Sequence, residues 1–129
     1  MRWFNKREHK EVWEDIKLPM SDDFEAARKL REICNSAASS AEKAGSQTGA
    51  GDAARHEAER YKRAAKVAME IAIKISDDLL RDAAVCQIVA LCMKANDLKP
   101  AAILFRAVQD PSLRENLLRE HPALRQLVE

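Results

Sequence analysis

Aromatic residues, glycine and proline are all scarce in this sequence. Phe, Trp and Tyr make up 5% of the 129 residues, and the chain has 3 Gly and 4 Pro. Sheet proteins favour β-branched and aromatic residues and need frequent turns, so this composition disfavours a β architecture and predicts an all-α fold. At this length we expect one domain, 1–129, whose core needs neither a metal nor a disulfide.

Signals for disulfides, membrane spans and targeting are also missing. The 3 cysteines, Cys34, Cys86 and Cys92, are an odd number without close spacing, which indicates buried thiols in a reducing compartment. No apolar run approaches the roughly 20 residues of a membrane span, and the first residues contain no apolar leader segment. We therefore expect a cytoplasmic protein with no membrane span.

Charge of one sign does not dominate either. Lys and Arg number 22 and Asp and Glu 21, for a net charge of +1, which argues against a polyanion as obligatory partner. Acidic residues at Glu57 and Glu59 interrupt the one basic stripe, and no aromatic ladder accompanies it, so we predict no nucleic acid partner. That stripe consists of Arg55, Arg60, Lys62, Arg63 and Lys66.

No constellation for catalysis or metal binding is present. His9, His56 and His121 lie far apart and have no ligand at metal spacing. Cys86 and Cys92 are six residues apart, so on one helix they point about 120° away from each other. We expect no catalytic residue, no metal and no cofactor, which means a non-enzymatic protein.

Apolar residues at helical spacing predict six or seven helices joined by short turns. The predicted helices span about 5–17, 22–44, 52–75, 77–95, 98–109 and 111–119, with a last short one from Pro122. Asp52, Ser76 and Asp110 are expected to cap the helices at 52–75, 77–95 and 111–119. They divide the domain into an N-terminal aromatic helical segment (1–19), a long alanine-rich hairpin (22–75), a second hairpin (77–109) and C-terminal capping helices (111–129).

The long hairpin carries a seam of small residues in steps of three and four, which predicts close antiparallel packing. Its positions are Ala27, Leu30, Cys34, Ala37, Ala41 and Ala44, then Ala54, Ala58, Tyr61, Ala65, Ala68, Ala72 and Ile75. Gly45 is a natural residue to end the first helix. The helix at 77–95 is apolar on more than one side, which predicts that it is the central helix.

One octapeptide occurs twice. The sequence at 75–82 has a looser copy at 108–115, with an Asp that starts a helix and an arginine four residues later in both. Arg81 and Arg114 are these arginines. We predict that they bond acids one turn back, with a partner-binding role as the alternative.

Asn96-Asp97-Leu98 forms a turn between two helices, and Ala101, Phe105 and Val108 follow at steps of four and three. This pattern resembles a tetratricopeptide-type repeat over roughly 66–118. The resemblance implies stacked antiparallel helical hairpins in a right-handed superhelical or bundle arrangement, and a role in binding other proteins. It brings no catalytic residue with it.

These patterns predict a protein–protein interaction module or small scaffold that uses a groove beside the helix at 77–95, or that self-associates through its alanine-rich hairpin. Trp3, Phe4 and Trp13 either cap the hairpin core or are partly exposed and contact a partner, a second copy or a membrane surface. Tryptophan is frequent among interface hot spots. The alternative function is a regulatory or sensor bundle that binds a small molecule in an internal apolar pocket. That pocket is predicted to be lined by Cys34, Cys86, Cys92, Met69 and Met93.

Overall fold

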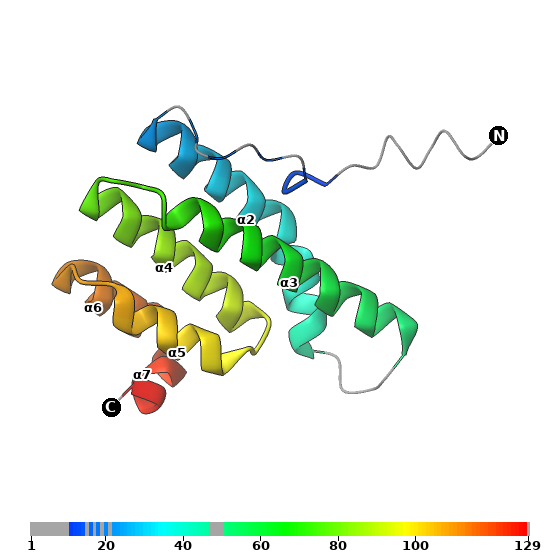
Figure 1. Ribbon diagram of the computed structural model, residues 1–129. Coiled ribbons are helices and arrows are strands. Elements are labelled where there is room, and N and C mark those ends of the chain that lie inside the picture. Colours follow the sequence, from blue (N-terminus) through cyan, green and yellow to red (C-terminus); the bar gives the residue numbers. More distant parts are fainter. Residues whose placement is uncertain are drawn as a thin grey trace.

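Six helices make up most of the described chain, which in this computed structural model covers residues 11–14, 16, 18, 20, 22–46 and 51–128 (Figure 1). The helices are α2 (Asp23–Ser46), α3 (Asp52–Ala72), α4 (Asp78–Lys94), α5 (Leu98–Ala107), α6 (Pro111–Glu120) and α7 (Pro122–Val128). No strand occurs within the described ranges. The predicted all-α fold is confirmed.

Aspartates begin three of the helices. The side chain of Asp22 accepts a hydrogen bond from the N–H of Glu25 at 2.7 Å, which satisfies one free donor of the first turn of α2. Asp77 and Asp110 accept equivalent bonds, three residues on, at 2.9 and 3.0 Å. The sequence predicted Ser76 as the cap of α4, which is wrong by one position, because the carboxylate of Asp77 provides the acceptor.

Asp52 is a second corrected cap. It is the first residue of α3, and Gly51 precedes it without a side-chain hydrogen bond. The cap of α6 was predicted correctly, with Asp110 followed by Pro111 in the first turn.

The turn between α4 and α5 is built on Asn96. Its φ of 57° places it in the left-handed region that a helix commonly uses to end. The N–H of Asp97 donates to the carbonyl of Cys92 at 2.9 Å, and the N–H of Asn96 donates to that of Met93 at 3.0 Å. This pair of bonds is a Schellman motif in which asparagine takes the position usually occupied by glycine.

α4 is the central helix, as its apolar composition predicted. It packs against α2, α3, α5 and α6, and α7 closes one end of the bundle against α5 and α6. The largest fully buried side chains belong to every helix except α6; they include Leu30 and Ile33 in α2, Ile71 in α3, Ile88 and Val89 in α4, Phe105 in α5 and Leu124 in α7.

The seam of α2 is wider than its alanine pattern predicted. Leu30, Cys34, Ala37 and Ala41 are buried as expected, and Ile33 is buried beside them. The predicted outer members of the seam, such as Ala27, are only half-buried. The reason is that α2 contacts both α3 and α4, so a narrow stripe does not suffice.

Gly45 has a different role from the predicted one. It lies inside α2, where a Cβ atom would come within 2.4 Å of the carbonyl oxygen of Lys94 and 2.9 Å of the carbonyl carbon of Ala95. Glycine is therefore required here because the end of α4 approaches the backbone of α2.

The helix predicted at 5–17 falls mostly outside the described residues. Within the described part, Glu11–Glu14 form a turn in which the N–H of Glu14 donates to the carbonyl of Glu11 at 3.1 Å. α3 also ends three residues earlier than predicted, at Ala72, and α5 ends at Ala107.

Candidate functional site

Trp13 lies in the core. Its side chain is 4% exposed, and the guanidinium of Arg60 covers the ring 5.1 Å from its centroid. Its indole N–H is buried without a hydrogen-bond partner in the described chain. Trp13 therefore caps the hairpin core, and the alternative of an exposed contact residue does not hold for it. Trp3 and Phe4, the other predicted contact residues, lie outside the described residues.

Arg60 ties the N-terminal segment to the long hairpin. Its Nε and Nη2 atoms each donate to a carboxylate oxygen of Glu11 at 2.8 Å, and Nη1 donates to the hydroxyl of Ser40. Ser40 in turn donates to Glu57 at 2.7 Å, and this bond holds the pKa of Glu57 below its usual value. Arg60 was predicted to lie on a basic stripe. Its two hydrogen bonds to Glu11 and its contact with the ring of Trp13 instead hold it between the N-terminal segment and α3.

Arg81 and Arg114 stabilise two equivalent corners, which are the turns between α3 and α4 and between α5 and α6. Nη1 of Arg81 donates to the carbonyl of Ile75, and Nη1 of Arg114 donates to that of Val108, both at 2.8 Å. Each carbonyl lies six residues back, just before the corner turns. The repeated octapeptide thus forms the same contact twice.

The predicted bond to an acid one turn back exists for Arg81, whose Nη2 lies 2.5 Å from Asp78. Arg114 has Pro111 at the corresponding place, and its guanidinium instead stacks 4.6 Å from the centroid of Phe105. The role of these arginines as partner-binding residues stays a prediction.

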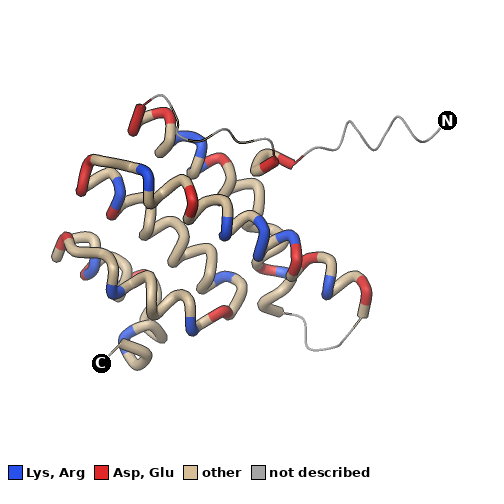
Figure 2. Tube along the Cα trace, in the orientation of Figure 1, with Lys and Arg blue, Asp and Glu red and all other residues tan. Residues whose placement is uncertain are grey.

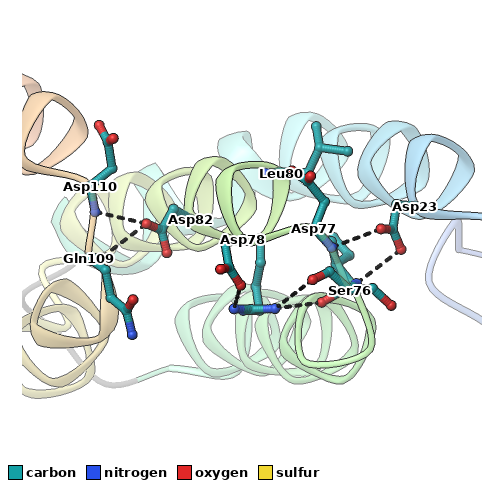
Figure 3. Close-up of polar contacts among 10 residues, drawn as sticks. Asp23, Ser76, Asp77, Asp78, Leu80, Asp82, Gln109 and Asp110 are labelled. Carbon is teal, nitrogen blue, oxygen red and sulfur yellow. Dashed lines mark hydrogen bonds and ion pairs between the residues drawn. The ribbon is translucent and has the colours of Figure 1, made fainter.

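Two further aspartates, neither of which caps a helix, stabilise the two corners (Figure 3). The carboxylate of Asp23, at the start of α2, accepts bonds from the N–H groups of Ser76 and Asp77 at 3.1 and 2.9 Å. Asp82 in α4 accepts from Gln109 and Asp110 at 3.0 and 2.9 Å. All these groups serve the joints between helices, so the corners are structural.

A surface groove runs beside α4, between α3 and α5. α3 and α5 both pack on α4 but make no substantial interface with each other within the described chain, so α4 forms the floor between them. The groove has a volume of about 250 Å³ and is lined by Tyr61, Lys62, Ala65, Lys66, Met69, Ile88, Cys92, Asp97, Pro100 and Leu104.

Two polar side chains at the groove, Tyr61 and Asp97, are paired with each other. The hydroxyl of Tyr61 donates to Asp97 at 2.8 Å, and burial raises the pKa of Tyr61 far above its usual range. Burial also raises the pKa of the Cys92 thiol. These groups are therefore held in their protonated forms at neutral pH, and neither is a base or a nucleophile there.

Sequence reasoning described a groove beside α4 but did not identify its walls. Tyr61 and Ala65 were assigned to the seam that packs on α2, whereas both also line the groove. The missing information was the packing: α3 and α5 both contact α4 but have no substantial interface with each other within the described chain. The stripe of Tyr61, Ala65 and Met69 in steps of four was the available signal.

The residues predicted to line one internal pocket are divided between sites. Met69 and Cys92 line the groove, whereas Cys34 lines a smaller hollow of about 150 Å³ between α2 and α4. α4 separates the two, because Cys92 faces α3 and α5 while Leu91 faces α2.

The described residues contain no group of three or more His, Cys, Asp or Glu side chains placed to hold a metal ion. None of the described helices combines the length and the apolar character that crossing a membrane requires. Comparisons with protein-family models, with curated proteins and with solved structures find no match to this chain.

Proposed function

We propose that this protein is a non-enzymatic interaction module that binds a segment of another protein in the groove between α3, α4 and α5. The main observation in support is an apolar groove whose floor, formed by Ile88 and Cys92, belongs to the central helix. Such a floor is rigid because both residues are buried in the core that α4 organises. A rigid apolar groove favours binding because little ordering is needed when a partner enters.

The groove's volume favours a protein segment over a small molecule. Pockets for drug-sized ligands hold roughly 300–1,000 Å³, whereas this groove holds about 250 Å³. That space suits a few apolar side chains of a larger partner. The titratable groups beside it are hydrogen-bonded or protonated, which is why the proposal contains no catalytic step.

A cytoplasmic location and the tetratricopeptide-like arrangement belong to the same proposal. The three cysteines are free, and two of them are buried, as expected for a reducing compartment. The order in which the helices pack, with α2 on α4 and α4 on α6, supports stacked hairpins. A regulatory bundle that binds a small molecule is the alternative function.

The test compares two neighbouring residues of α5. Leu104 lines the groove, whereas Ile103 is 55% exposed on another side of the helix. A photo-crosslinking side chain at Lys66 should join the protein to a partner in its native cells. Leu104→Gln should abolish that product and Ile103→Gln should leave it, with circular dichroism showing that both variants are folded.

Two results would contradict the proposal. One is crosslinking that is equally strong in the Leu104→Gln variant, because the groove would then be irrelevant. The other is a stabilising shift in melting temperature produced by a metabolite and lost in the same variant, which would establish the alternative function.

A further inference from the structure

Two lysines stand on the α3 side of the groove. Lys62 and Lys66 are exposed, lie four residues apart on one face of the helix, and line the groove together with Ala65 and Met69. Neither has an ion-pair partner in the described chain. Three other lysines of the described chain do, because Lys29 pairs with Glu32, Lys43 with Glu57 and Lys94 with Glu42, whereas Lys74 and Lys99 also have none but do not line the groove.

The opposite wall contributes no cation to the groove. Pro100 and Leu104 line it from α5, and the carboxylate of Asp97 at the turn is engaged by the hydroxyl of Tyr61. The groove therefore joins an apolar floor to one basic edge, with the hydrogen-bonded carboxylate of Asp97 beside Tyr61. Lys62 and Lys66 are the charged residues that α3 contributes to the groove, whereas residues of both signs occur along α3 as a whole (Figure 2).

The shape of the groove suits a helix. Its residues on α3, from Tyr61 to Met69, form a straight wall of about 12 Å, because a helix rises about 1.5 Å per residue. A helix laid along this wall presents apolar side chains three and four residues apart to the floor. Carboxylates four residues apart on its flank match the spacing of Lys62 and Lys66.

We propose that the groove's partner is an acidic amphipathic helix, which inserts apolar side chains between Met69 and Leu104 and pairs its carboxylates with Lys62 and Lys66. This inference rests on the proposed function and specifies the chemistry of the partner. The lysine stems pack on the apolar residues of the partner while the ammonium groups reach its carboxylates.

The test uses two fluorescent helical peptides with the same leucine stripe, one flanked by glutamates and the other by lysines. Binding to the full chain is followed by fluorescence anisotropy. The acidic peptide should bind at least tenfold more tightly than the basic one, on the order of what two partly desolvated ion pairs provide. Its affinity should fall as salt is added.

A charge-reversed protein sharpens the result. Lys62→Glu combined with Lys66→Glu should invert the preference between the two peptides. Arg63→Glu is the matched control, because Arg63 is exposed on α3 and does not line the groove. It should leave the preference unchanged, and Leu104→Gln should weaken both peptides.

The outcomes separate this inference from the proposed function. Equal binding of both peptides that is lost in Leu104→Gln overturns the inference and leaves the interaction module standing. No binding of the acidic peptide at about 1 mM, a weak limit for any specific complex, also overturns the inference. A dimer that is seen by sedimentation and lost in the Leu104→Gln variant overturns the inference, because the groove would then bind a second copy of the chain. Displacement of the acidic peptide by monomeric decanoate, at a concentration below that of the peptide, also overturns it, because the groove would then bind an anionic amphiphile.

Discussion

Asp23 and Asp82 make the same contact in different surroundings. Each carboxylate accepts two successive backbone N–H groups at a corner. Asp82 is buried, at 7% exposure, and its two hydrogen bonds are partly buried, whereas Asp23 is half-buried and its two hydrogen bonds are exposed. An N–H group that loses its acceptor is hydrated by water more readily at an exposed corner than at a partly buried one.

Asp82→Ala should therefore lower the free energy of unfolding by about 2–3 kcal/mol, and Asp23→Ala by about 1 kcal/mol or less. Urea unfolding followed by circular dichroism measures both losses. Asp82→Asn, which keeps an acceptor oxygen, should lie between them. Equal losses for the two alanine variants would show that burial does not govern the contact.

The thiols of Cys34 and Cys86 are held protonated. Burial raises their pKa to about 12 and about 11, and for Cys86 the nearby carboxylates of Asp82, Glu120 and Asp110 add to the effect. Only the thiolate reacts with a disulfide reagent, and a rise of two pKa units lowers its fraction by roughly 100-fold.

In the native protein at pH 8, Cys86 should react with an aromatic disulfide reagent about 100-fold more slowly than free cysteine. Cys34 should react more slowly still. The absorbance of the released thiolate follows the reaction. In guanidinium chloride all 3 cysteines should react at the rate of the free amino acid. Fast labelling of the native protein at Cys86 would contradict this expectation.

At the scale of helices, the contact of α2 with the end of α4 is closely packed and therefore sensitive to substitution. A Cβ at Gly45 would come within 2.4 Å of the Lys94 oxygen, whereas one at Gly51, in the loop before α3, would meet nothing within 4 Å. The clash involves backbone, which gives way only if a whole helix end moves.

Gly45→Ala should lower the free energy of unfolding by about 1–3 kcal/mol even though alanine favours helices, because overpacking outweighs propensity here. Gly51→Ala should change it by less than about 0.5 kcal/mol, since an exposed change without a lost contact has little effect. Thermal unfolding of the two variants compares them. A stabilised Gly45→Ala variant would mean that the two helices stand further apart.

Helix positions were predicted well from the sequence, and helix ends less well. Periodic apolar residues set α2 and α4 almost completely, whereas the cap of α4 moved from Ser76 to Asp77 because both residues suit the position. The N–H groups of both candidates also bond to Asp23, a residue 53 positions from Ser76. Local patterns do not contain that information.

At the scale of the whole molecule, the sequence predicted a helical bundle around α4 and a groove beside it, but not the residues that form the walls of the groove. The groove lies where α3 and α5 both pack on α4 without a substantial interface with each other in the described chain. Arg60 and Lys62, two residues apart in one basic stripe, have opposite outcomes: the first is locked on Glu11 and the second lines the groove. Such a difference follows from tertiary packing and not from residue type.

The order of packing also bears on how the chain reaches this structure. Every substantial interface among the described helices joins two helices that are consecutive in the chain or are separated by one other helix. Helical proteins whose interfaces join helices close together in chain order fold in microseconds to milliseconds. The main refolding phase in a stopped-flow dilution from urea should be complete within about 10 ms, apart from slow phases due to proline isomerisation.

A main phase of seconds would mean that a contact between distant helices limits the reaction. Because each interface joins helices that are close in chain order, α2 and α3 can pair while later residues are still being synthesised. Each further helix then packs on the helices that are already folded. The same neighbour-to-neighbour packing that leaves α3 and α5 apart thus lets the chain fold in the order in which the ribosome releases it.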